Sequence, residues 1–103
     1  MNTNNEDRYD LLRKSTMSGD YDLTKFYLEH SDIDLTNDHS FIESAAYYGY
    51  YNIVELLLEH NANPNGFGGL IGVTKSKGHD NINKLLKIYE RNNILKKIKS
   101  KID

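Results

Sequence analysis

A glycine recurs through this chain at near-constant spacing, and the residues that follow it recur with it. Gly19 and Gly49 are 30 residues apart, and each precedes an apolar helical pattern that ends in Leu-Glu-His. A weaker third copy starts at Gly78, which is 29 residues after the second glycine. A period of about 30 residues is typical of proteins built from stacked supersecondary units.

Each copy predicts two helices, one on either side of its glycine. Apolar residues recur at helical spacing before and after Gly49, for example at Ile42 and Ala45 and then at Ile53 and Leu57. The glycine stands where the first helix must stop, a position that favours a left-handed backbone. One such unit cannot bury its apolar face alone, whereas about three stacked units form a continuous core.

The repeats predict one all-α domain over residues 1–103, with units at about 8–37, 38–67 and 68–90. Residues 91–103 continue the helical pattern, with isoleucines on one side and lysines on the other. We expect them to form a C-terminal capping helix with a polar outer face. The predicted architecture is therefore a solenoid of stacked helix-turn-helix repeats closed by this cap.

The second copy resembles the ankyrin repeat. Its residues 40–49, Ser-Phe-Ile-Glu-Ser-Ala-Ala-Tyr-Tyr-Gly, stand where that family has Thr-Pro-Leu-His-x-Ala-Ala-x-x-Gly. Residues 53–65 stand where the family has its second helix and the ending Gly-Ala-Asp-Val-Asn, and Gly78-His79 matches its Gly-His. The Thr-Pro start is absent from all three copies. The resemblance implies an ankyrin-type scaffold that binds proteins through its concave face and has no shared chemistry.

The same resemblance suggests a contact surface. Tyr47 and Tyr48 occupy the two variable positions at the end of the first helix, which face ligands in the family, and aromatic rings provide large contact area at low entropic cost. Tyr50 and Tyr51 are instead expected to cover neighbouring repeats. Met17 and Lys77 stand at the equivalent positions of the first and third copies, and His39 and Phe67 lie in the connecting loops that would flank this surface. The predicted partner-binding residues are Met17, His39, Tyr47, Tyr48, Phe67 and Lys77.

Composition argues against catalysis and against a membrane span. The chain has no cysteine, which excludes disulfides, thiolate metal sites and a cysteine nucleophile. Its four histidines show neither a metal-ligand spacing nor a Ser-His-acid grouping. No run approaches the roughly 18 apolar residues of a membrane helix, and the Asn-rich acidic start does not resemble a secretory signal. We expect a non-enzymatic protein without cofactors, located in the cytoplasm, or in the host cytoplasm if it is viral.

Charge is strongly polarised along the chain. Residues 1–63 carry 12 acidic and 4 basic side chains, whereas residues 75–103 carry 9 basic and 3 acidic ones. Blocks of like charge usually form solvated faces of a protein. Such a block can also steer a charged partner to one end of the molecule. The C-terminal lysines lack interleaved aromatic residues, so a solvated cap is favoured over nucleic-acid binding.

One loop suggests a minor alternative, a calcium site. Residues 32–43 carry oxygen-bearing side chains at the ligand positions of an EF-hand loop and lie between two predicted helices. However, Asn37 replaces the glycine of the sharp turn, and His39 replaces the apolar eighth residue. The same residues are also explained as the junction between two repeats.

We therefore expect a protein-binding module, an adaptor or scaffold, whose partner is another protein. The alternative is a dedicated inhibitor or immunity protein whose acidic residues, in the first two repeats, meet the basic active site of one enzyme or toxin. A monomer is expected, with a homodimer through the tyrosine-rich face as the alternative.

Overall fold

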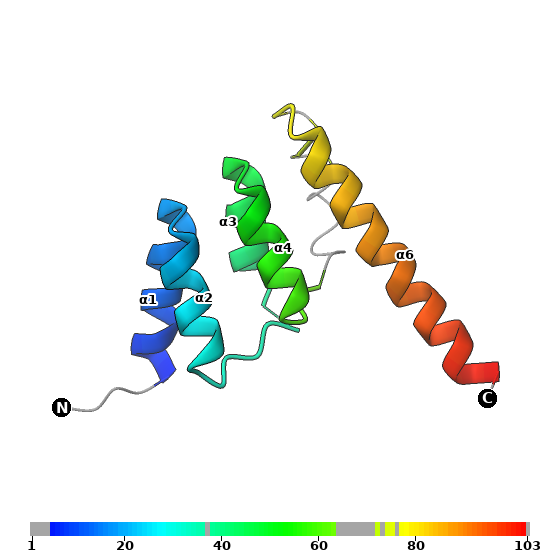
Figure 1. Ribbon diagram of the computed structural model, residues 1–103, viewed down its shortest axis with the longest axis horizontal. Coiled ribbons are helices and arrows are strands. Elements are labelled where there is room, and N and C mark those ends of the chain that lie inside the picture. The colour runs from blue at the N-terminus through cyan, green and yellow to red at the C-terminus, as the bar shows by residue number, and fades with distance from the viewer. Residues whose placement is uncertain (1–4, 37, 64–71, 73, 76, 103) are drawn as a thin grey trace.

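The computed structural model describes residues 5–36, 38–63, 72, 74–75 and 77–102. Over these residues every extended regular element is an α-helix, and there is no strand. The helices are α1 (Asn5–Ser18), α2 (Tyr21–Glu29), α3 (Ser40–Tyr48), α4 (Tyr51–Glu59) and α6 (Asp80–Ile102). Figure 1 shows α1 packed with α2 and α3 packed with α4, the two pairs side by side, and α6 beyond α4. The predicted all-α architecture of stacked helix pairs is confirmed.

The turns at the three glycines share one backbone geometry. Gly19, Gly49 and Gly78 have φ angles of 78°, 81° and 77°, in the left-handed region that favours glycine. At Gly49 the amide donates to the Ala46 carbonyl, and the next amide donates to the Ala45 carbonyl. The same two hydrogen bonds recur at Gly19 and at Gly78. This pattern ends a helix and satisfies its last carbonyl groups, which explains the recurrence of glycine in the sequence.

Asp20 begins α2 by accepting a hydrogen bond from the backbone N–H of Leu23 at 3.1 Å. Because this bond satisfies an amide that lacks a partner within the helix, we expect Asp20→Ala to lower the free energy of unfolding by about 1 kcal/mol. Urea denaturation followed by circular dichroism measures the change. Asp22→Ala, in the first turn of the same helix, is the matched control and should lower the free energy of unfolding by only a few tenths of a kcal/mol. Equal losses in the two variants would contradict the capping role.

The core runs through both helix pairs and into α6. Leu12, Ile42, Leu57 and Leu86 are fully buried, and so is Ala45, whose small side chain allows close approach of the neighbouring helix. α1 packs on α3, α2 packs on α4, and α4 packs on α6. The units therefore share one continuous apolar cluster, as a solenoid requires.

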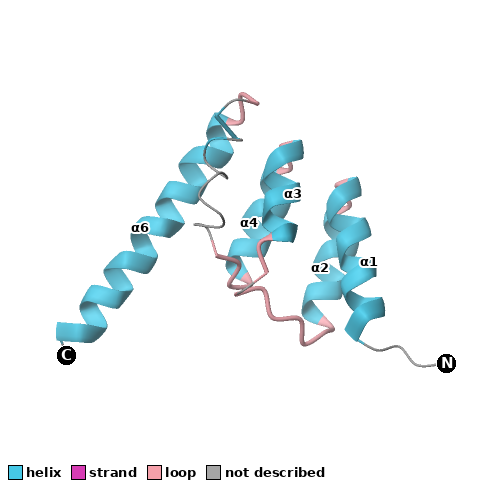
Figure 2. Cartoon of the chain, turned by 180° about the vertical axis from the view of Figure 1, so that it is seen from behind, coloured by secondary structure: helices cyan, strands magenta, loops and turns pink. Residues whose placement is uncertain are grey.

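α6 combines the second helix of the third unit and the predicted C-terminal cap in one helix. It continues without a break across residue 91, because neither glycine nor proline interrupts the sequence after Gly78. Its C-terminal half diverges from α4 (Figures 1 and 2). Ile94, Leu95 and Ile98 there are about half exposed, so the outer face is not the polar one expected. None of the described helices is long and apolar enough to cross a membrane.

Candidate partner-binding surface

Two side-chain rings join the turns of successive units. The Tyr50 ring covers Gly19, where an added Cβ would lie 2.9 Å from ring carbons, and its hydroxyl donates to the Met17 carbonyl at 3.3 Å. The His79 ring covers Gly49 in the same way and lies closer, 2.6 Å from an added Cβ. Its Nε2 is 3.2 Å from the Tyr47 carbonyl. The residues after the second and third glycines, Tyr50 and His79, thus seal the glycine turn of the preceding unit.

The exposed tyrosines build on this arrangement. The Tyr47 and Tyr48 rings meet edge to face at 5.1 Å between centroids, and Tyr48 stacks on Tyr50 at 5.8 Å. The Lys77 ammonium lies 4.5 Å from the centre of the Tyr47 ring, within the range of a cation–π interaction. Tyr47 and Tyr48 remain 45% and 48% exposed, and Met17 is also exposed beside Tyr50. We call Met17, Tyr47, Tyr48 and Lys77 the tyrosine surface.

The tyrosine surface lies along one edge of the stack, where the three glycine turns are found (top of Figure 1). It contains four of the six residues predicted from the sequence. His39 directly precedes α3, at the end of that helix opposite Tyr47, so about 12 Å of helix separates the two residues. His39 therefore does not adjoin the tyrosine surface, because the loops between units leave the stack at the edge opposite the turns. Phe67 lies outside the described residues.

Sequence reasoning missed the role of Tyr50 and His79 as inter-unit seals. Tyr50 was expected only to cover a neighbouring repeat, and its contacts with Gly19 and Met17 confirm that expectation. His79 was noted only for matching a family motif. The available signal was that a ring-bearing residue follows the glycine in both the second and the third copy.

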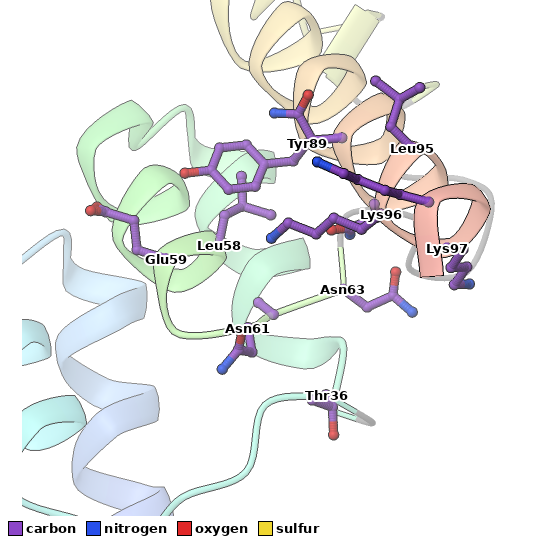
Figure 3. A pocket seen from close by; sticks show the side chains of 13 residues that line it. Thr36, Leu58, Glu59, Asn61, Asn63, Tyr89, Leu95, Lys96 and Lys97 are labelled. Atoms are coloured by element: carbon purple, nitrogen blue, oxygen red, sulfur yellow. The ribbon is translucent and has the colours of Figure 1, made fainter. Parts of the chain in front are cut away.

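A groove between α4 and α6 was also not predicted. It has a volume of about 840 Å³, and Tyr89 reaches across it toward Leu58 (Figure 3). Burial and, secondarily, the charges of Glu59 and Glu55 raise the pKa of Tyr89 above its usual value, so its neutral form is favoured. The amides of Asn61, Asn63, Asn92 and Asn93 and the side chains of Lys96, Lys97 and Lys99 line the rest of the groove.

The carboxylates of the 32–43 loop form local turns. Asp34 accepts hydrogen bonds from the Thr36 hydroxyl at 2.6 Å and the Thr36 amide at 2.9 Å, which lower the pKa of the Asp34 carboxyl. Asp38 accepts the equivalent two bonds from Ser40 at the start of α3. No group of three or more histidine, cysteine or acidic side chains able to hold a metal ion occurs within the described parts of the chain.

Comparison with known families identifies the repeat. The family model described as the ankyrin repeat matches residues 43–66, which include the second half of α3, the turn at Gly49 and α4. The chain therefore contains an ankyrin repeat, and its stacked helix pairs are consistent with a short ankyrin repeat protein. Ankyrin repeats generally mediate protein–protein binding and are typically non-catalytic, so the chain has the fold of an interaction module. No curated protein and no solved structure matches this ankyrin repeat chain.

Proposed function

We propose that this ankyrin repeat chain acts as one domain and binds a partner protein through the tyrosine surface, as an adaptor or scaffold. One observation carries the proposal: Met17, the two tyrosines and Lys77 come from three successive glycine turns and form a continuous surface of half-exposed and exposed side chains. Tyrosine is enriched among the residues that contribute most to binding energy at protein interfaces. Of the predicted concave binding face, the proposed contact uses only the edge at which the first helix of each unit ends in its glycine turn.

The arrangement of the rings supports binding in a second way. Tyr48 is held between Tyr47 and Tyr50, and Tyr47 also contacts Lys77, so the rings are ordered before a partner arrives. A pre-ordered aromatic side chain loses little conformational entropy on binding, which leaves more of the contact energy as affinity. An intracellular location for this module remains a prediction from the sequence.

A dedicated inhibitor is the second candidate, and the charge distribution favours it. The 12 acidic side chains in residues 1–63 outnumber the 4 basic ones, so the first two units would attract a basic active site. An inhibitor has one tight partner whose activity it abolishes, whereas an adaptor has several weaker partners. An activity assay of the captured partner therefore distinguishes the two candidates.

The double variant Tyr47→Ala, Tyr48→Ala tests the proposed surface. Each ring is half exposed, so we expect little change in melting temperature but a loss of partner affinity of about 30-fold or more. Capture from a lysate of the source or host cell identifies the partner, and titration calorimetry with the purified partner measures the loss.

The control is Tyr21→Ala, which also removes a tyrosine ring, 38% exposed, but at the start of α2. The control should retain the wild-type affinity. Retention of the partner by the folded tyrosine variant would rule out this surface, and equal losses in both variants would show that the effect is not specific to it.

A further inference from the structure

The first unit exposes apolar side chains at positions that the second unit buries. Leu11, Leu23 and Phe26 are 43%, 45% and 51% exposed. Thirty residues further on, their counterparts Phe41, Ile53 and Leu56 are 2%, 2% and 5% exposed. We call Leu11, Leu23 and Phe26 the head surface.

The burial of the second-unit counterparts comes from the first unit. Phe41 stacks on Tyr9 of α1 at 6.0 Å between ring centroids, and the Arg13 guanidinium lies 5.7 Å from the centre of the Phe41 ring. α2 packs on α4, which carries Ile53 and Leu56. The head surface therefore has the form of a stacking face to which another helical unit could be added.

The other end of the stack exposes a second apolar surface. Ile88, Ile94, Leu95 and Ile98 of α6 are each about half exposed. At 100° per residue Ile98 lies opposite the buried pair Leu85 and Leu86, Ile94 and Leu95 lie to either side of Ile98, and Ile88 lies between Leu85 and Leu95. The exposed isoleucines and leucine are the tail surface. Residues 87, 90, 91, 94 and 95 line a shallow groove of about 480 Å³ on it.

The charges beside Phe26 and those beside the groove on the tail surface are of opposite sign, whereas Arg8 and Lys14 flank Leu11 on α1. Asp22 and Glu29 stand four residues before and three residues after Phe26, so they flank its ring on α2. On the tail surface, Lys87 and Arg91 line the groove with Ile94 and Leu95, where Glu90 is the single acidic lining residue. Residues 91–102 carry five basic side chains and no acidic one.

We propose that the head surface of one copy docks on the tail surface of another, so that the chain assembles head to tail. In this arrangement the Phe26 ring enters the groove beside Ile94 and Leu95, and Asp22 and Glu29 approach Lys87 and Arg91. A tail-to-tail contact would oppose basic side chains, and a head-to-head contact that brings the two Phe26 rings together would oppose acidic ones, so the charge pattern disfavours these symmetric dimers. A head-to-tail contact leaves a free head and a free tail on every oligomer and therefore does not stop at the dimer.

Sedimentation velocity over micromolar to near-millimolar concentrations tests the wild-type chain. We expect the weight-average mass to rise beyond roughly twofold that of the monomer without a plateau, and to fall when salt is added, because charge complementarity is screened. A constant monomer mass throughout, or a plateau at the dimer, would overturn the proposal.

Two complementary variants test the contact itself. The head variant is Leu23→Gln, Phe26→Gln and the tail variant is Ile94→Gln, Ile98→Gln; all four side chains are half exposed, so both variants should fold. Each variant alone should stay monomeric, whereas an equimolar mixture should form a one-to-one heterodimer, because each supplies the surface that the other lacks. The variant Tyr47→Ala, Tyr48→Ala should assemble like the wild type.

The other outcomes overturn the head-to-tail contact. Assembly of the tail variant alone would indicate a head-to-head contact, and assembly of the head variant alone would indicate a tail-to-tail contact. If either glutamine variant melts below the wild type, Asp22→Lys, Glu29→Lys replaces the head variant, since it leaves the apolar side chains in place. Unchanged assembly of that charge-reversed protein would also contradict the proposal.

Discussion

Leu57→Ala is expected to lower the free energy of unfolding by about 3 to 4 kcal/mol. Leu57 lies within α4 and is fully buried in the apolar cluster that joins the helix pairs to α6. Truncation removes its transfer free energy and leaves a cavity that neighbouring side chains fill only in part. Because small domains have total stabilities of about 5 to 15 kcal/mol, this loss removes a large fraction of the total.

Urea denaturation at low protein concentration measures this loss, and Leu95→Ala is the control. Leu95 is 52% exposed on the outer side of α6, so its truncation should cost less than about 0.5 kcal/mol in the monomer. A large loss for Leu95→Ala would mean that the outer side of α6 is packed in the free chain. That result would also remove one of the residues on which the tail surface rests.

Gly49→Ala is expected to cost about 2 to 3 kcal/mol, through two separable effects. The first is backbone strain, since Gly49 has a φ of 81°. The second is steric, because an added Cβ would lie 2.6 Å from Cε1 of His79 and would displace the ring from the Tyr47 carbonyl. Thermal denaturation of Gly49→Ala and of Gly78→Ala measures the two effects separately.

Gly78→Ala provides the matched control for the strain alone. Gly78 has a φ of 77°, but no atom of the described residues lies within 4 Å of an added Cβ. We expect a cost of about 1 to 2 kcal/mol there. In a His79→Ala background, Gly49→Ala should cost no more than Gly78→Ala does, because the steric effect is gone. Equal costs of the two glycine variants in the wild-type background would show that the ring contact contributes nothing.

Much of the fold could be predicted because its determinants are local. Gly19 and Gly49 end helices through their own backbone conformation, and Ala45 permits close packing through its size, so single residues at fixed spacing carry the information. The end of α3 at Gly49 follows from the same pattern. The continuity of α6 could have been predicted from the lack of glycine and proline after Gly78.

The candidate site was less predictable because it depends on how the units are placed relative to one another. Tyr47 and Tyr48 were correctly expected at the end of a first helix, but that His79 would lie on Gly49 depends on the register between units. His39 was predicted to flank the tyrosines from its connecting loop, but sequence spacing does not say at which edge of the stack that loop lies.

The exposed ends of the stack were the least predictable feature. Leu23 and Phe26 recur at the same spacing as Ile53 and Leu56, so the repeat pattern does not distinguish the exposed pair from the buried one. Their exposure differs because the second pair is covered by α2 while the first pair faces away from the stack. Burial in a solenoid depends on the neighbouring unit as much as on the residue itself.

The turns at Gly19 and Gly49 are each covered by a ring from the next unit, so the two contacts form in a fixed order as the chain is synthesised. Tyr50 is 33 residues downstream of Met17, whose carbonyl it bonds, and His79 is 32 residues downstream of Tyr47. A ribosome releases the chain from its N-terminus, so the turn at Gly19 emerges well before the ring that covers it. During synthesis the first and the second unit therefore each stay unsealed until the following unit has left the exit tunnel.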